Sequence, residues 1–209
     1  MARRAFTLPK SVGGFHDYFK MNAESGVVLA ALGYNFVRGD LKLPRTSSPL
    51  TELSTTLRKR IRDALLVVAM TSETARREFL IAPLVLEVAL ATHAQLHSEF
   101  AVQISPLLHG SFDFFLEKRN ALVVVEAKHA DMTRGFTQLC AELVAADAFA
   151  EDEATTIHGA VSFGNIWQFG SLDRATKTVT QDISLFSVPT DLDDLLAVLV
   201  GILNDDPVQ

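Results

Sequence analysis

Three residues in the middle of this 209-residue chain could together perform metal-dependent chemistry. Asp113 lies in the stretch GSFDFFLE, and Glu126 and Lys128 lie in the stretch ALVVVEAK that follows it. Residues two apart in a strand share a face, so Glu126 and Lys128 are predicted to point the same way. The two apolar runs flank the short polar segment KRN, which predicts an antiparallel hairpin. A two-residue turn at 119–120 would place Asp113 directly opposite Glu126.

Directly opposed residues of such a hairpin have Cβ atoms about 5 Å apart. Two carboxylates that close repel each other unless a cation lies between them. Their oxygens suit a hard cation, Mg²⁺ or Mn²⁺. Lys128 would stand beside the metal, where it would orient an attacking water or stabilise charge on a phosphate. This expectation depends on the turn, because a one-residue shift in register moves one acid to the other face.

The elements around these residues predict one mixed α/β (α+β) architecture with a central mixed β-sheet flanked by helices. Helices are expected at 24–32, at 53–70 and from Thr71 or Ser72 onward, the last with a kink or break at Pro83. A small hairpin is expected at 34–43. The period then changes from 3.6 to 2, which predicts strands at 99–106, 110–117 and 121–128. The predicted order continues with a helix at 133–152, two strands within 156–172, a strand at 176–186 and a closing helix at 189–203.

Composition excludes several classes of protein. Hydrophobic residues make up 48% of the chain, enough for a sizeable core. No run reaches the ~18 apolar residues of a membrane span, and no secretory signal is recognisable at the start. The single Cys140 excludes an internal disulfide and a cysteine-based zinc cage, and it lies on an apolar stripe expected to be core. The expectation is a cytoplasmic protein without membrane association.

The spacing Asp113, twelve residues, Glu126-Ala127-Lys128 resembles the motif of the PD-(D/E)xK nucleases, the restriction-endonuclease-like superfamily. The order helix, three strands, helix, strand is similar to their common core. Three further segments add to the resemblance, which covers roughly residues 71–172: SETARREFLIAPLVLEV, RGFTQLCAEL and GAVSFGNIWQFGSL. The sequence departs from the family at Phe112, which stands in place of the proline of the motif name. It also has Glu142 where helicase-linked members carry a tyrosine.

The resemblance implies hydrolysis of DNA phosphodiester bonds with Mg²⁺ or Mn²⁺. Asp113 and Glu126 would bind the metal with the carbonyl oxygen of Ala127, and Lys128 would act on the water. Glu73 would complete the acidic set, with Glu78 left open as its rival, and Gln138 would orient Lys128 or a phosphate. The predicted division is a basic, helical N-terminal extension at 1–70 and a nuclease-like domain at 71–209.

Charge is unevenly spread along the chain. Residues 1–80 hold 13 Lys/Arg against 7 Asp/Glu, and residues 81–209 hold 6 against 18. The cations of the helix at 53–70, with Arg76 or Arg77, are therefore expected to track the phosphates of DNA: Arg58, Lys59, Arg60 and Arg62. The alternative is a nuclease-like nucleic-acid-binding or regulatory module with little or no activity, favoured by the acidic C-terminal half. A homodimer is left open.

Overall fold

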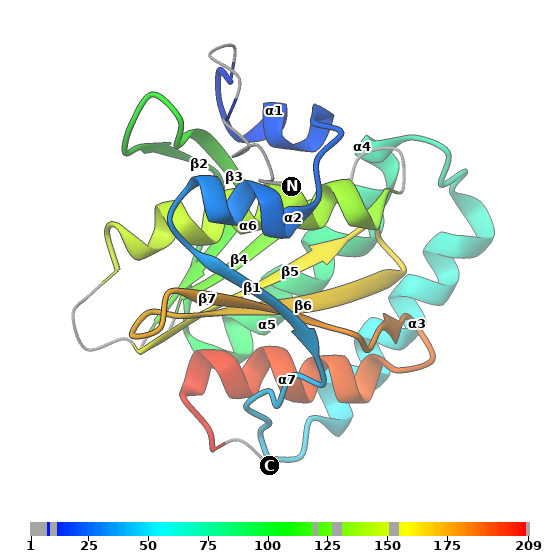
Figure 1. The fold of residues 1–209 in the computed structure, drawn as a ribbon. Helices are drawn as coiled ribbons and strands as arrows, with labels where there is room; N and C mark the ends of the chain where they lie inside the picture. Colours follow the sequence, from blue (N-terminus) through cyan, green and yellow to red (C-terminus); the bar gives the residue numbers. More distant parts are fainter. Residues whose placement is uncertain (1–7, 9–11, 119–120, 127–130, 151–154, 208–209) are drawn as a thin grey trace.

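The computed structural model describes residue 8 and residues 12–118, 121–126, 131–150 and 155–207, with the backbone alone for 121–126. Figure 1 shows a twisted sheet between two layers of helices. This arrangement confirms the predicted class, a mixed α/β fold with a central mixed sheet flanked by helices.

The sheet combines antiparallel and parallel strand pairs. β1 pairs with β7 and β4 with β5 in parallel, and the other neighbours are antiparallel. In spatial order the strands are β1 (Asn35–Gly39), β7 (Thr178–Asp182), β6 (Ile166–Asp173), β5 (Thr156–Ser162), β4 (Ala121–Glu126), β3 (His109–Glu117) and β2 (Gln95–Gln103), with β8 (Phe186–Ser187) beside β6.

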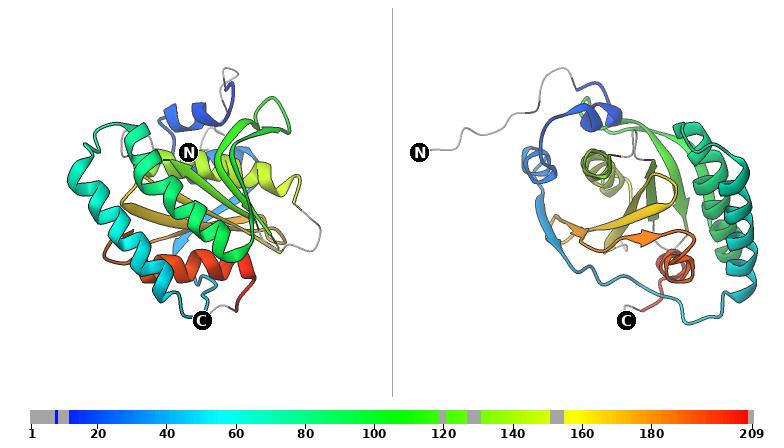
Figure 2. Two further views of the ribbon diagram at one scale, coloured as in Figure 1. Left: turned by 180° about the vertical axis from the view of Figure 1, so that it is seen from behind. Right: turned by 90° about the vertical axis from the view of Figure 1, so that its right-hand side faces the viewer.

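Helices cover both faces of the sheet (Figures 1 and 2). One face carries α1 (Phe15–Lys20), α2 (Ser25–Ala31) and α6 (Met132–Asp147). The other carries α5 (Ala82–Thr92) and α7 (Leu192–Asn204), with α3 (Thr51–Val67) packed against them. The short α4 (Glu73–Arg76) and the π-helical η1 (Arg77–Ile81) lead directly into α5.

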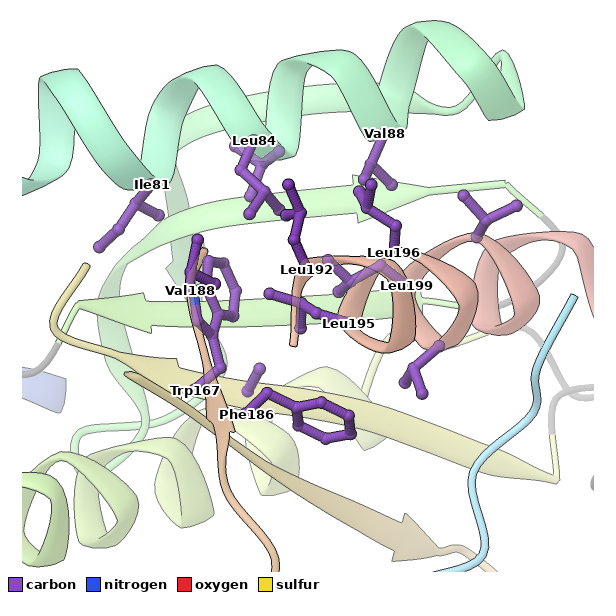
Figure 3. Close-up of a cluster of buried hydrophobic side chains, with 14 of the residues drawn as sticks. Ile81, Leu84, Val88, Trp167, Phe186, Val188, Leu192, Leu195, Leu196 and Leu199 are labelled. Atoms are coloured by element: carbon purple, nitrogen blue, oxygen red, sulfur yellow. The ribbon is translucent and has the colours of Figure 1, made fainter. Parts of the chain in front are cut away.

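Two apolar cores follow from this layering. The first lies between the sheet and α5 and α7, where Leu84, Trp167 and Leu195 are all buried (Figure 3). The second lies under α6, whose residues from Gly135 to Ala146 are all buried. Cys140 belongs to this second core, as predicted, and burial raises the pKa of its thiol. Trp167 donates from its indole nitrogen to the carbonyl of Gly164 at 3.2 Å, so it serves the hairpin between β5 and β6.

The helix around Pro83 differs in an informative way from the expected kink or break. The chain stays helical from Glu73 to Thr92, but Arg77–Ile81 forms a π-helical turn just before Pro83. Proline lacks the N–H that would continue the i→i−4 ladder, and a wider turn relieves the mismatch. The predicted cap at Ser72 is confirmed, because its hydroxyl accepts a 3.0 Å hydrogen bond from the amide of Ala75.

The N-terminal third is not purely helical. The hairpin expected at 34–43 is wrong, since β1 pairs in parallel with β7, about 140 residues further along the chain. The predicted boundary near residue 70 lies in the loop between α3 and α4, but residues on both sides of it share the same sheet and the same core. Within the described ranges, no helix has the length and apolar character needed to cross a membrane.

Candidate functional site

A cavity of about 450 Å³ lies between the start of α1, α4, the β2–β3 pair and α6. Three of the residues proposed for the catalytic site line it: Glu73 from α4, Asp113 from β3 and Gln138 from α6. The remaining lining residues of the described structure are Gly13, Gly14, Phe15, His16, Thr74, Arg77, Glu99, Gly110 and Ser111. The fold thus brings side chains from three distant segments to one place.

Asp113 lies at an irregularity in the β2–β3 ladder. Ser98 pairs with Phe114 and Phe100 with Phe112, which places Glu99 and Asp113 opposite each other, but these two residues do not form a regular ladder pair. Glu99 has a φ of 53°, which is unusual for a residue other than glycine. Phe112 packs in the core under α6, whereas Phe114 packs in the core beside α5 and α7. The alternation of faces along β3 therefore breaks at Asp113.

The predicted register between β3 and β4 is wrong by one residue. Phe114 pairs with Val124, where a two-residue turn required Val125, and Glu117 pairs with Ala121, which leaves three residues between the strands. Asp113 is therefore not the direct partner of Glu126. In a regular hairpin, a register shift of one residue would place Asp113 and Glu126 on opposite faces of the sheet. The alternation of faces along β3 breaks at Asp113, so this conclusion does not follow here.

Asp113 and Glu126 nevertheless lie toward the same end of the sheet. Asp113 comes one residue before Phe114 in β3, and Glu126 comes two residues after Val124 in the antiparallel β4. Glu126 is the last residue of β4, and its backbone pairs with Ser162. The side chain of Glu126, together with Ala127 and Lys128, lies outside the described structure, so the predicted convergence of these groups stays a prediction.

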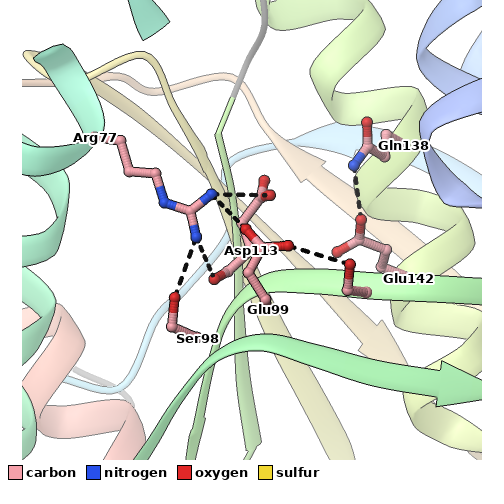
Figure 4. A network of polar contacts seen from close by, with 7 residues as sticks. Arg77, Ser98, Glu99, Asp113, Gln138 and Glu142 are labelled. Carbon is pink, nitrogen blue, oxygen red and sulfur yellow. Dashed lines mark hydrogen bonds and ion pairs between the residues drawn. The ribbon is translucent and has the colours of Figure 1, made fainter. Parts of the chain in front are cut away.

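Arg77 is the cation that the structure places beside Asp113 (Figure 4). Its Nη1 lies 2.6 Å from Oε1 of Glu99 and 3.8 Å from Oδ1 of Asp113. Its Nη2 donates to the hydroxyl of Ser98 at 3.1 Å and to the backbone carbonyl of Asp113 at 3.3 Å. The guanidinium lies over the ring of Phe114, 4.9 Å from its centroid. Contacts on both edges and one face hold it in a defined position.

Glu73 lines the cavity from the first turn of α4, directly after the Ser72 cap. Its rival Glu78 is exposed and is not among the residues that line the cavity. The geometry therefore favours Glu73 over Glu78 as the third acid. Glu73 lies in α4 before the π-turn, whereas Glu78 lies within it, and π-turns are frequent at functional sites.

Gln138 is buried on α6, with 4% of its surface exposed. Its Nε2 donates to Oε1 of Glu142, one helical turn further on, at 2.8 Å (Figure 4). Glu142 is fully buried. The side-chain oxygen of Gln138 is buried and has no hydrogen-bond partner among the described residues. Glu142 thus fixes the amide with its nitrogen toward the next turn of α6, and the oxygen of Gln138 is left as an acceptor.

The cations of α3 are placed differently from the expectation. Arg58 donates to the carbonyl of Pro189 and forms a 2.9 Å ion pair with Asp193 of α7. Lys59 pairs with Asp63 on its own helix at 2.7 Å. None of these residues lines the cavity with Asp113. Arg60 and Arg62 are exposed, so both are accessible to a polyanion.

Glu99 is the cavity residue that sequence reasoning missed. It was assigned to a regular strand, where its neighbour across the ladder could not be foreseen. Its one recognisable signal is its place as an acidic residue directly before the apolar run that begins at Phe100. The positive φ that turns it toward Arg77 depends on the tertiary structure.

A metal site of carboxylate oxygens fits the donors at this cavity. Glu73, Glu99 and Asp113 all line it, and carboxylates are the ligands that Mg²⁺ and Mn²⁺ prefer. Among the residues whose side chains are described, no group of three His, Cys, Asp or Glu is close enough to hold an ion. A complete site would therefore need Glu126 or the backbone that follows it.

Comparison with known proteins adds no assignment to this geometry. No protein-family model matches the sequence, and no curated protein matches it. The function must therefore be argued from the residues themselves.

Proposed function

We propose that this protein is a metal-dependent nuclease of the PD-(D/E)xK type that hydrolyses phosphodiester bonds in DNA. The observation that carries the proposal is the shared cavity of Glu73, Asp113 and Gln138, at the end of the sheet where β4 reaches Glu126. These residues come from a helix, a strand and a second helix, in the order that the motif requires. Their residue types and positions follow from the sequence resemblance, independently of the cavity.

In this proposal, Asp113, Glu126 and the carbonyl of Ala127 would hold Mg²⁺ or Mn²⁺. When bound, the metal would lower the pKa of a water and neutralise phosphate charge. Lys128 would orient that water or stabilise the charge that develops on the phosphate. Glu73 would complete the acidic set, and Gln138 would accept a hydrogen bond from the lysine or the water.

A second candidate is a nuclease-like module that binds nucleic acid without cleaving it. The observation in its favour is Arg77, which compensates Glu99 and Asp113 through ion contacts within the chain. A carboxylate cluster neutralised in this way is stable without a metal ion. The two candidates differ in one measurable property, which is cleavage.

The test is a cleavage assay on plasmid and on linear DNA, with Mg²⁺, with Mn²⁺ and with a chelator. The pure protein should cleave only with metal, and Lys128→Ala and Asp113→Ala should each abolish cleavage. Asp113→Ala should keep its metal-free melting temperature within a few degrees, because Arg77 retains Glu99 and Ser98 as partners. Metal-dependent binding without cleavage would favour the second candidate, and equal activity of the Lys128 variant would contradict the first.

A further inference from the structure

The geometry of Arg77 raises the question of what keeps its guanidinium from sitting directly on Asp113. Carboxylate and guanidinium normally form two parallel hydrogen bonds when they meet without constraint. Here the Nη1 to Oδ1 distance is 3.8 Å, longer than a hydrogen bond. The same Nη1 lies 2.6 Å from Glu99. Glu99, rather than Asp113, therefore holds the charged end of Arg77.

The position of Glu99 is maintained by the chain around it. Its φ of 53° lies in the left-handed region, which is unfavourable for a non-glycine residue. Its second oxygen, Oε2, accepts a 3.2 Å hydrogen bond from the hydroxyl of Ser111 in the neighbouring strand. Both carboxylate oxygens thus have partners, one on Arg77 and one on Ser111. Backbone strain that persists at a cavity is a reason to look for a function.

We propose that Glu99 is a positioning residue that holds Arg77 beside Asp113, so that the guanidinium does not compete with a divalent cation for this carboxylate. The inference rests on the proposed metal site. Arg77 would then act in two ways. Without metal, it would compensate the negative charge of Glu99 and Asp113, and with metal it would leave the Asp113 carboxylate available as a ligand. Among the described residues that line the cavity, Arg77 is the one Lys or Arg.

The alternative is that Glu99 only adds negative charge near the metal. If Glu99 acted only through its charge, neutralising Glu99 would weaken cation binding by a similar factor with and without Arg77. A positioning role instead makes the effect of Glu99 depend on Arg77, because without Glu99 the guanidinium closes onto Asp113. A double-mutant cycle separates the two explanations, since it measures the coupling between the residues.

The experiment measures Mn²⁺ affinity by isothermal titration calorimetry for the full-length protein, E99Q, R77Q and E99Q/R77Q. We expect E99Q to weaken Mn²⁺ binding by about tenfold or more when Arg77 is present, and by less than about threefold in the R77Q background. Glu117→Gln is the matched control, because Glu117 is an exposed glutamate and the last residue of β3, and it should change the affinity less than about twofold.

Equal factors for E99Q in the two backgrounds would overturn the positioning role and leave the metal site intact. A native protein that binds no Mn²⁺ at all would overturn the proposed function and this inference with it. Ser111→Ala is a milder variant that leaves the charge of Glu99 unchanged and removes only the bond that anchors it. It should weaken Mn²⁺ binding in the same direction as E99Q, and an affinity unchanged from the native protein would count against the anchor.

Discussion

Gln138 and Glu142 form a buried hydrogen-bonded pair on α6, with Nε2 of Gln138 2.8 Å from Oε1 of Glu142. The carboxylate accepts a hydrogen bond from the amide nitrogen and so sets the direction in which the amide oxygen points. The pair is thus structural support for a residue of the candidate site.

Removal of the acid should destabilise the protein. In Glu142→Ala the buried Nε2 of Gln138 loses its acceptor, and an unsatisfied buried donor costs about 1–3 kcal/mol. We expect a lower free energy of unfolding in urea and a melting temperature several degrees lower. Glu78→Ala is the control, since the exposed Glu78 should cost less than about 0.5 kcal/mol. Equal stabilities of the two variants would show that the Gln138–Glu142 bond contributes nothing.

His158 should make the stability depend on pH. Burial lowers the pKa of this β5 histidine from its usual 6.5 to about 4. Between pH 4 and pH 6.5, His158 is therefore protonated in the unfolded chain and neutral in the folded chain. The free energy of unfolding is highest above about pH 6.5 and falls as the pH is lowered toward 4. The loss at pH 5 should be on the order of 2 kcal/mol.

The measurement is urea unfolding of the native protein and of His158→Gln at pH 7 and pH 5. The variant lacks the titrating group, so its stability should fall less between the two pH values than that of the native protein. Other groups titrate in the same range, and the comparison cancels them to first order. Identical pH dependence of the two proteins would contradict the assignment to His158.

Arg58 and Arg62 should differ in their effects although they lie one turn apart on α3. Arg58 is tied to Asp193 and Pro189, so Arg58→Ala should lower stability by about 1 kcal/mol and leave the salt dependence of DNA binding unchanged. Arg62 is exposed, and Arg62→Ala should make the slope of log K against log salt shallower by about 0.9 if it meets a phosphate. Fluorescence anisotropy at several salt concentrations measures both slopes. If Arg58→Ala made the slope shallower and Arg62→Ala did not, Arg58 rather than Arg62 would be the residue that contacts phosphate.

Local patterns predicted most of the elements and three members of the cavity. Alternating apolar residues located β3 and β4, and the Ser72 cap located the start of α4 beside Glu73. The β3–β4 register was wrong because turn length is set by geometry that composition does not encode. β1 was misread because its partner β7 lies about 140 residues away, beyond any local signal.

The same limit explains why Glu99 was missed and Arg77 left undecided between two arginines. The π-turn sets the direction of Arg77, and the positive φ of Glu99 turns its carboxylate to the guanidinium. Both features are deviations from ideal helix or strand geometry. Periodic sequence patterns predict only ideal helices and strands, so they could not indicate either feature. Residues that break a local rule are where functional sites are found most often.

The central claim, a divalent metal held by Asp113 and Glu126, is tested most directly by crystals soaked in Mn²⁺ and measured at the manganese absorption edge. The proposal predicts one anomalous peak about 2–2.5 Å from a carboxylate oxygen of Asp113 and from one of Glu126. The peak should disappear in Asp113→Ala. A peak bound elsewhere, or none at millimolar Mn²⁺ in crystals with an open cavity, would contradict the claim.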